Sequence, residues 1–349
     1  MSSVINRREL LEPLKRVLTD NKRNIFDGTD SDLRIIRLSL SRPLHRRDDR
    51  YHQILNVTYA SDSGRFQKKL WLKFRQDFEA LFKIHTTAYE KLGTDQQFLP
   101  KPYFYTKWDQ TSVIGMELIN GASLRNMVLR KVMSRRTRAL QETFFKIGRG
   151  MRRFHDSSTA SGTQRVAELA AAAHRVTAAT EYLTDEEKKT IIQHVQIAER
   201  DADPQTELPL IKIHNDWVLR NILISDSSSF YVVDLDSMRS PNNSRWYDVS
   251  YFLINVESQL KYWPIIDKKS MTDLWQSFWL GYSEKGSPDA LSSYQIRSLI
   301  YLIKVQYLFG ATIRPPLFKI YNNLLGPVYL RHLKKSIIQG EYSTVAAEP

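Results

Sequence analysis

Apolar positions near the start of the chain follow first a helical period and then a strand period. An amphipathic helix is predicted over residues 7–20, with Pro13 near its first turn. Its apolar positions are Leu10, Leu11, Leu14, Val17 and Leu18. Three β-rich runs follow, at residues 32–39, 53–60 and 68–74. Because a Ser-Asp-Ser-Gly turn joins the last two, these runs predict an antiparallel sheet.

The middle of the chain is mainly helical in pattern. Between the helices, an apolar strand beginning at Ser112 ends at Glu117. The helical patterns cover residues 76–92, 139–155 and 166–180, and a further one begins at Thr184. The helix over 139–155 has a core-spaced apolar face and ends in His155, for which a packed structural role is predicted.

Residues 214–236, HNDWVLRNILISDSSSFYVVDLD, have a different pattern. They read as a short acidic loop, an apolar strand, a Ser/Asp turn and a second apolar strand. Tyr231, Val232 and Val233 form the second strand, which ends at Asp234. We therefore expect Asp216, Asn221 and Asp234 at the ends of one β-hairpin.

The last third of the chain returns to helical patterns. One helix opens around Asp248, and amphipathic helices are predicted over residues 270–338. The longest apolar stretch, 298–313, is interrupted by Lys304 and Gln306, so no transmembrane helix is predicted. The N-terminus has no apolar segment typical of a signal peptide.

Composition restricts the class of protein. The 349 residues are 42% hydrophobic, which excludes a wholly disordered chain, and the formal net charge of +13 favours anionic partners. The chain has no cysteine, and a cytoplasmic location is expected. Peripheral contact with an anionic membrane or glycan is a second expectation, based on the basic residues Arg130, Lys131, Arg135, Arg136, Arg138, Arg331, Lys334 and Lys335. No nucleic-acid-binding motif is present, so nucleic acid is not expected as a partner.

The hairpin at 214–236 carries the residue types needed for chemistry on a metal-bound phosphate. Asp216 can accept a proton from an attacking hydroxyl, while Asn221 and Asp234 supply the oxygen ligands that Mg²⁺ prefers. Asp236 is a second candidate ligand, since alternation along a strand directs it to the same face as Asp234. The alternative is a surface hairpin whose Asp and Asn residues serve only the turn.

The spacing H-x-D-x-x-x-x-N, filled by His214, Asp216 and Asn221 and followed by the strand-borne Asp234, resembles the catalytic loop of protein kinases. More closely it resembles the aminoglycoside phosphotransferase and choline kinase-like family of small-molecule kinases. The resemblance implies that Asp216 is the catalytic base, with Asn221 beside it, and that His214 supports the loop. It also implies ATP or GTP and Mg²⁺ as cofactors.

Lys73, in the pattern LWLKF, corresponds to the lysine that binds the α- and β-phosphates in this family. The alternative is an exposed strand lysine. Family members place its carboxylate partner where this chain has His85. Glu79 and Glu90 lie on the flank of the same helix, so the partner of Lys73 stays open among these three residues.

Two further segments concern the nucleotide. Residues 117–124 fit the pattern E-x-x-x-G-x-x-L, which resembles the family's hinge and implies that the backbone of Met116, Glu117 and Leu118 binds adenine. Residues 41–52, where such enzymes carry a glycine-rich loop, contain no glycine. Arginine side chains in this segment can take over the phosphate contacts, or the segment is a solvated loop.

Asp248 matches a family position whose carboxylate hydrogen-bonds the catalytic-loop backbone and fixes its shape. The local alternative for Asp248 is a helix N-cap. The resemblance covers residues 32–310 and implies an α+β, two-lobed protein-kinase-like fold. Its domains are a small antiparallel-sheet lobe at 1–116 and a larger helical lobe at 117–349 that carries the catalytic loop and acceptor site.

The function implied is transfer of the γ-phosphoryl group of ATP or GTP to a small-molecule hydroxyl, in a sugar, amino-sugar or related alcohol. Clustered basic residues favour a neutral sugar or anionic acceptor over a polycationic antibiotic. The alternative is a catalytically inactive nucleotide-binding module of the same fold. The missing glycines and the displaced glutamate favour that alternative, whereas Asp216, Asn221 and Asp234 together favour the enzyme.

Overall fold

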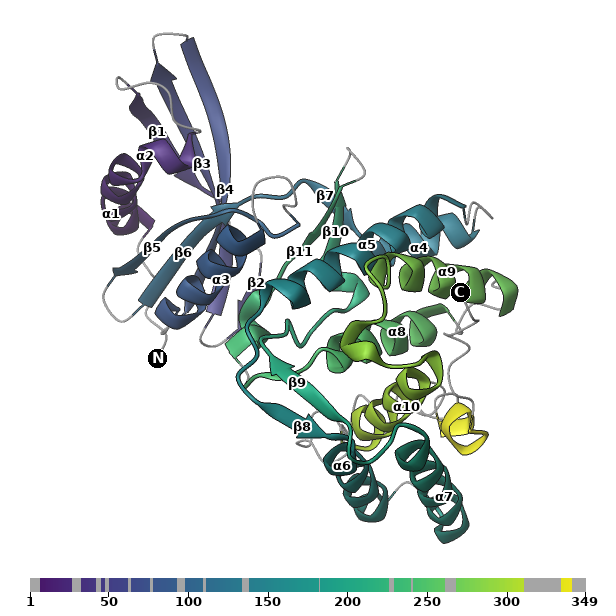
Figure 1. The fold of residues 1–349 in the computed structure, drawn as a ribbon. Coiled ribbons are helices and arrows are strands. Elements are labelled where there is room, and N and C mark those ends of the chain that lie inside the picture. The colour runs from purple at the N-terminus through teal and green to yellow at the C-terminus, as the bar shows by residue number, and fades with distance from the viewer. Residues whose placement is uncertain are drawn as a thin grey trace. The chain divides into compact units, whose positions relative to one another are not determined.

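The computed structural model divides into two compact units, Met1–Asn120 and Gly121–Pro349 (Figure 1). The predicted division of domains, after residue 116, stays a prediction. Within the chain, the residues that the structure describes are 7–26, 33–41, 45–47, 50–61, 64–75, 78–92, 98–108, 111–133, 138–181, 183–225, 229–239, 241–260, 268–310 and 334–340.

The first unit is built on an antiparallel sheet with strand order β1-β3-β4-β6-β5, to which β2 is added by pairing with β3. Along the chain, a pair of helices precedes the sheet, and a third helix connects β4 to β5 (Figure 1). The elements are α1 (Arg7–Asp20), α2 (Lys22–Ile25), β1 (Arg34–Leu40), β2 (His45–Arg47), β3 (Arg50–Ser61), β4 (Gly64–Arg75), α3 (Glu79–Leu92), β5 (Pro102–Trp108) and β6 (Thr111–Glu117).

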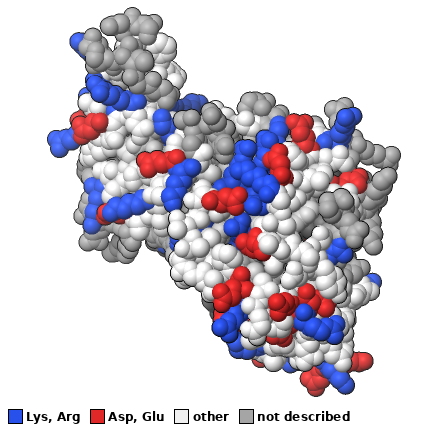
Figure 2. Space-filling model, viewed as in Figure 1, with Lys and Arg blue, Asp and Glu red and all other residues white. Residues whose placement is uncertain are grey.

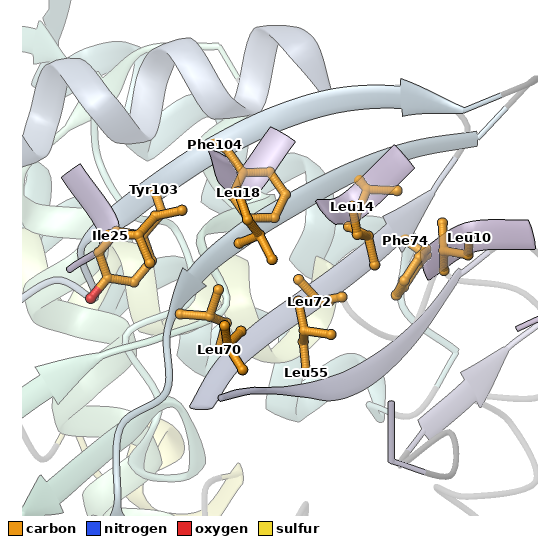
Figure 3. Packing of buried hydrophobic residues seen from close by; sticks show 12 residues of the cluster. Leu10, Leu14, Leu18, Ile25, Leu55, Leu70, Leu72, Phe74, Tyr103 and Phe104 are labelled. Carbon is orange, nitrogen blue, oxygen red and sulfur yellow. The ribbon is translucent and has the colours of Figure 1, made fainter. Parts of the chain in front are cut away.

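The hydrophobic core of the first unit lies between α1 and one face of the sheet (Figure 3). Leu10, Leu14 and Leu18 form the buried stripe of α1, as the helical period predicts. On the sheet, alternate residues of β4 face this stripe, namely Leu70, Leu72 and Phe74. The residues between them, Trp71 and Lys73, therefore belong to the opposite face.

Two local predictions in this unit are wrong. Pro13 lies in the interior of α1, because the helix begins at Arg7. Part of the segment 41–52 is strand rather than solvated loop: His45–Arg47 form β2, in register with Arg50–His52 of β3. Alternation of Arg and His with few apolar residues hides a short edge strand from a search based on hydrophobic period.

The second unit is mostly helical, with two small antiparallel sheets of order β11-β10-β7 and β12-β9-β8. Its helices are α4 (Leu124–Met133), α5 (Arg138–Ser157), α6 (Val166–Ala179), α7 (Asp185–Asp201), α8 (Trp246–Leu260), α9 (Lys268–Tyr282) and α10 (Ser293–Gly310). Its strands are β7 (Gly121–Ser123), β8 (Thr163–Arg165), β9 (Glu207–Ile211), β10 (Ile222–Ser225), β11 (Phe230–Val232) and β12 (Asn243–Ser244). Short 3-10 helices are η2 (Leu219–Asn221), η3 (Leu235–Arg239) and η4 (Pro288–Ala290).

Helices α5 and α9 approach each other closely at two glycines. A Cβ atom added at Gly148 of α5 would lie 2.0 Å from the carbonyl oxygen of Phe278 in α9. Reciprocally, a Cβ at Gly281 of α9 would lie 2.0 Å from the carbonyl oxygen of Phe145 in α5. No carbon atom fits against an oxygen at this distance, so only glycine permits the crossing.

We therefore expect Gly148→Ala to lower the free energy of unfolding by about 3 kcal/mol or more, since the two backbones must separate to admit the methyl group. Chemical denaturation of the purified variant measures this change. Gly310→Ala is the control, because within the described part of the chain its new Cβ meets Val176 Cγ1 alone, at an ordinary contact distance of 3.9 Å. Equal denaturation midpoints for the two variants would contradict the close crossing.

Lys304, which interrupts the apolar stretch over 298–313, belongs to a buried ion pair. Lys304 of α10 donates to Glu257 Oε2 of α8 at 3.0 Å and to the hydroxyl of Ser336 at 2.6 Å, and all three side chains are buried. The lysine therefore belongs to the core of the second unit. Among the described residues, the structure contains no helix with the length and apolarity needed to span a membrane.

Candidate functional site

The candidate site is built around the β10–β11 hairpin and the loop that leads into it. β10 pairs with β11, and on its other side with β7, as Figure 1 shows. Gly121 of β7 is needed for this pairing, because a Cβ there would lie 2.5 Å from the Ile224 carbonyl oxygen. The predicted apolar strands of the segment 214–236 are thus β10 and β11, with Asp216 before the first and Asp234 after the second.

Asp248 of α8 fixes the shape of the loop that precedes β10. Its carboxylate accepts hydrogen bonds from the backbone N–H groups of His214, at 2.8 Å, and Asn215, at 2.7 Å. This is the contact that the family resemblance implied for Asp248. Asn215 has φ +61°, a left-handed conformation that Asn tolerates better than most residues. The carboxylate therefore stabilises a backbone turn that is costly on its own.

The alternative role of Asp248, a helix N-cap, is wrong. Helix α8 begins at Trp246, so Asp248 lies inside its first turn. Its carboxylate also accepts a hydrogen bond from His155 Nε2 at 3.1 Å. Burial lowers the pKa of His155, and the neutral ring then accepts the Tyr282 hydroxyl at Nδ1, 2.8 Å away. His155 is thus the buried structural histidine expected from the sequence.

His214 is buried and has a supporting place in the loop. The backbone N–H of Asp216 donates to its Nδ1 at 3.2 Å, which puts the ring proton on Nε2. Burial lowers its pKa, against the opposing effect of the Asp248, Asp216 and Asp234 carboxylates. The ring packs edge-on against buried Trp217, with centroids 5.9 Å apart. Neutral His214 therefore orients the backbone at Asp216.

Asp216 combines partial burial with an adjacent cation. Burial raises the pKa of its carboxyl group, and repulsion from Asp234 acts in the same direction. The Arg220 guanidinium, 3.6 Å from Oδ2, opposes this rise, as does the hydrogen bond from Asn221. The result is a carboxylate with raised proton affinity that is still 29% exposed.

Asn221 is buried beside Asp216, and its amide orientation is fixed by its neighbours. Nδ2 donates to the backbone oxygen of Asp216 at 3.1 Å and to its Oδ2 at 2.7 Å. The backbone oxygen and the ionised carboxylate can accept hydrogen bonds but not donate them, so the amide nitrogen of Asn221 must face them. The side-chain oxygen of Asn221 is consequently directed away from Asp216, where it can serve as a metal ligand.

Asp234 follows β11 and is exposed, with φ +64°. Its negative charge acts to raise the pKa of both Asp216 and His214. The strand argument for Asp236 is wrong: β11 ends at Val232 and Asp236 lies in the 3-10 helix η3. In the part of the chain that the structure describes, no group of three or more His, Cys, Asp or Glu side chains forms a metal cluster.

The predicted nucleotide residues belong to the first unit. Lys73, on the sheet face opposite α1, is only 5% exposed, so the alternative of an exposed strand lysine is wrong. Of the three candidate partners on α3, His85 is buried, whereas Glu90 is exposed and Glu79 pairs with Lys83 at the surface. Both glutamates of α3 are therefore at the surface, whereas Lys73 and His85 are buried.

The predicted adenine-binding segment covers the last two residues of β6 and the residue after it. Met116 is buried, and Glu117 ends β6. The Glu117 N–H donates to the carbonyl of Lys101 at 2.9 Å, and its side chain accepts the Lys101 N–H at 3.1 Å. The side chain of Glu117 thus fixes the backbone, and Leu118 lies immediately beyond the strand.

Two residues that contact the loop were not singled out from the sequence. Asn255 of α8 accepts the Leu219 N–H at 3.0 Å, and Arg220 pairs with Asp216. The four-residue spacing of Asp216 and Arg220 gives no helical signal for this ion pair, because Asp216 lies in a loop and only Leu219–Asn221 form the 3-10 helix η2. The contact of Asn255 has no local signal, because 36 residues separate it from Leu219.

The placement of the basic side chains does not strengthen the prediction of membrane contact. Lys334 pairs with Glu187 at 2.7 Å. On the face drawn in Figure 2, acidic side chains lie beside the basic groups. Arg331 and the residues 134–137, which include Arg135 and Arg136, lie outside the described residues. Contact with an anionic membrane or glycan stays a prediction.

A kinase-like class is supported by comparison with known proteins. The model of the phosphotransferase enzyme family matches residues 91–267, about half of the chain, and the chain belongs to this family. No protein of curated function matches the chain in sequence.

Solved structures confirm the fold. A thermostable mutant of aminoglycoside phosphotransferase APH(4)-Ia, in its apo form, is similar with a TM-score of 0.52 at 10% identity, over 92% of this chain and 98% of that one. Its ternary complex with ADP and hygromycin B has a TM-score of 0.53 at 10% identity, over 88% and 94%. A Ralstonia eutropha protein assigned as an aminoglycoside phosphotransferase gives 0.53 at 12% identity, over 97% and 99%. At these identities the likeness concerns the fold, and the predicted α+β protein-kinase-like fold is confirmed.

Proposed function

We propose that this chain is a small-molecule kinase that transfers the γ-phosphoryl group of ATP, or of GTP, to a hydroxyl group. The observation that carries the proposal is the pair Asp216 and Asn221, joined by a 2.7 Å hydrogen bond on a loop that Asp248 holds in shape. Family membership supports the same class of reaction. Catalysis of phosphoryl transfer depends on positioning and electrostatics, and a rigid loop of this kind supplies both.

In the proposed reaction the acceptor oxygen forms a bond to the γ-phosphorus, and the bond from that phosphorus to the bridging oxygen of the diphosphate breaks. The proton of the acceptor hydroxyl passes to Asp216, whose raised pKa makes it a stronger base than an ordinary aspartate. Asn221 holds the Asp216 carboxylate in place. The products are the phosphorylated alcohol and the nucleoside diphosphate.

The residues present fit Mg²⁺. The side-chain oxygen of Asn221 and the carboxylate of Asp234 are hard oxygen donors from the two ends of one hairpin. Their close placement leaves the carboxylates of Asp216 and Asp234 repelling each other, a repulsion that a divalent cation would relieve. The ion would neutralise phosphate charge. Lys73 is proposed to bind the α- and β-phosphates, and the backbone of Met116 to Leu118 to bind adenine.

Magnesium-dependent nucleotide binding is the first expected result. ATP with Mg²⁺ at about 100 times Kd should raise the melting temperature by roughly 5 °C, since the ligand binds only the folded state. Asp234→Asn should remove most of the Mg²⁺-dependent part. Because Asn also tolerates positive φ, this variant keeps the backbone at Asp234.

Asp236→Asn is the matched control in the same thermal-shift measurement. Loss of the Mg²⁺-dependent part in this variant as well would make Asp236 a second ligand, reached from η3. Absence of any shift with both ATP and GTP would overturn the proposed function.

A second expected result concerns pH. A base must be ionised to act, so kcat/KM should fall as pH drops through the raised pKa of Asp216. The guanidinium of Arg220 lowers this pKa, so Arg220→Ala should move the acidic limb of the pH profile to higher pH. Arg200→Ala, on the exposed face of α7, is the control and should leave the profile unchanged. An unmoved profile for Arg220→Ala would remove Asp216 from the role of base.

The alternative, an inactive nucleotide-binding module, is favoured by one observation: neither glutamate of α3 is buried with Lys73. The two functions differ in turnover. Nucleotide binding without phosphoryl transfer to a panel of sugars, amino-sugars and other alcohols would support the module.

A further inference from the structure

The segment that leads into helix α8 is paired with the strand that leads into the catalytic loop. β12 pairs with β9 in an antiparallel register. The loop begins at His214, three residues after β9, and Arg245 directly follows β12 and precedes α8. Asp248, in the first turn of α8, then binds the loop backbone. The position of this first turn therefore decides where the loop backbone is held.

Two adjacent residues at the end of α5 hold this first turn. His155 Nε2 donates to the Asp248 carboxylate at 3.1 Å, and the Asp156 carboxylate accepts a hydrogen bond from Arg245 Nη1, also at 3.1 Å. Arg245 is three residues before Asp248, which is about one helical turn. Arg152 orients Asp156, because its Nε lies 2.9 Å from both carboxylate oxygens. The end of α5 and the start of α8 are thus joined at two points.

A second carboxylate, that of Asp289 in η4, contacts the same start of α8. Its Oδ1 lies 3.5 Å from Arg245 Nε, and its Oδ2 accepts a hydrogen bond from Trp246 Nε1 at 3.1 Å. Trp246 is fully buried, and the side chains of Arg245 and Asp289 are 10% and 8% exposed. Salt screens a buried ion pair much less than a surface pair. Arg245 therefore joins α5 to the connection between α9 and α10.

The backbone of η4 indicates that this contact is under constraint. Asp289 has φ +60° and the next residue, Ala290, has φ +54°. This left-handed conformation costs free energy for residues other than glycine, and alanine has no polar side chain to compensate for it. Such a backbone persists only where its surroundings hold it, and strain of this kind is common at functional sites. Here Arg245 and Trp246 hold Asp289.

The charge of Arg245 also acts on the histidine of this network. Burial lowers the pKa of His155, and the Arg245 guanidinium lowers it further, whereas Asp248 opposes this change. The neutral ring has one proton, which on Nε2 is donated to Asp248, while Nδ1 accepts the Tyr282 hydroxyl. Arg245 thus favours the neutral form of His155 that this arrangement requires.

We propose that Arg245 and Asp289 are positioning residues for phosphoryl transfer. The ion pairs of Arg245 with Asp289 and Asp156 fix the first turn of α8, and Asp248 on that turn holds the loop that carries Asp216. This inference rests on the proposed function and adds to it two residues that lie outside the catalytic loop. Turnover should therefore depend on Arg245 even when the protein is fully folded.

The variant Arg245→Met and the double variant Arg245→Met/Asp289→Asn separate positioning from stability. Arg245→Met removes the cation beside the buried Asp289 carboxylate and should lower the melting temperature. The second substitution removes that carboxylate charge, while an amide oxygen can still accept the Trp246 hydrogen bond and asparagine tolerates positive φ. The double variant should therefore recover most of the lost melting temperature.

Steady-state kinetics should give the opposite pattern. In both variants kcat should fall by about 10–100-fold, because a displacement of about 1 Å at the reacting groups can cost about 10²-fold. KM for Mg-ATP and for the acceptor should change by less than about threefold. Arg245→Lys keeps a cation that can reach one of the two carboxylates, so its kcat should exceed that of Arg245→Met by at least about threefold. Return of kcat to the wild-type value in the double variant would overturn the inference.

Hydrogen exchange of the backbone amides measures the loop without nucleotide or acceptor. The N–H groups of His214 and Asn215, which donate to Asp248, should exchange about tenfold faster in both variants than in wild type. Unchanged exchange at these amides in folded Arg245→Met protein would overturn the inference. Faster exchange in the variants, combined with no phosphoryl transfer by wild type, would count against the proposed function alone.

Arg149→Met is the matched control for the loss of an arginine from the same surroundings. Arg149 of α5 pairs with Glu284, in the connection between α9 and α10, at 3.9 Å, and the two side chains are 38% and 45% exposed. The melting temperature, kcat and the exchange of the loop amides should all remain at their wild-type values in this variant. Equal losses of kcat in Arg149→Met and Arg245→Met would contradict a specific role of Arg245.

Discussion

Asp216→Asn is expected to reduce phosphoryl transfer by about 10²–10⁴-fold, the usual effect of removing a general base. The amide is nearly isosteric and its oxygen can still accept the Asn221 hydrogen bond that the carboxylate receives at 2.7 Å. The loop should keep its shape, since the backbone contacts to Asp248 do not involve the Asp216 side chain. The measurement is kcat with saturating Mg-ATP and the best acceptor from a panel of alcohols.

Nucleotide affinity separates loss of the base from loss of structure. The thermal shift with Mg-ATP should be nearly the same for Asp216→Asn and wild type, because a base at the acceptor matters mainly in the transition state. Asp185→Asn, at the exposed start of α7, is the control for the loss of one surface charge. Transfer by Asp216→Asn at the wild-type rate would show that the catalytic loop is assigned wrongly.

Local patterns predicted most of the elements that position the site. The alternation of Leu70, Leu72 and Phe74 predicted β4, and Thr184 with Glu187 forms the capping box that opens α7. Extrapolation of the same patterns failed at Asp236. The chain leaves the strand through the positive φ of Asp234 and turns into η3, and a change of backbone conformation at one residue leaves no trace in hydrophobic alternation.

Long-range contacts limit how much of the candidate site can be predicted from the sequence. From residues alone, Asp248 fitted a helix N-cap as well as a loop contact, and the family resemblance indicated the hydrogen bonds across 33 and 34 residues. The ring contact of Tyr251 with Tyr307 likewise depends on two helices meeting, since these residues are far apart in sequence. Helical period predicts that each helix forms but not which of its faces will meet a partner.

Asp248→Ala is expected to lower the free energy of unfolding by about 3–5 kcal/mol. The substitution leaves the buried His214 N–H, the buried His155 Nε2 and the partly buried Asn215 N–H without the carboxylate that accepts them. It also removes the interaction that holds Asn215 at positive φ. Urea denaturation measures the loss of stability, and kcat of the folded fraction measures the loss of loop geometry.

Tyr282→Phe tests whether the hydrogen bond from Tyr282 to His155, which does not involve the loop, matters for turnover. It removes only the hydrogen bond to His155 Nδ1 and keeps the ring stacked on Phe278, so it should cost about 1 kcal/mol and leave kcat near wild type. The pair of variants therefore separates stability from positioning. Asp248→Ala should lose both stability and turnover, because the carboxylate binds the backbone N–H groups of the two residues that precede Asp216. If Asp248→Ala keeps the kcat of wild type at a temperature where it is folded, Asp248 contributes only stability, and the geometry of Asp216 is maintained by Asn255 and Asn221.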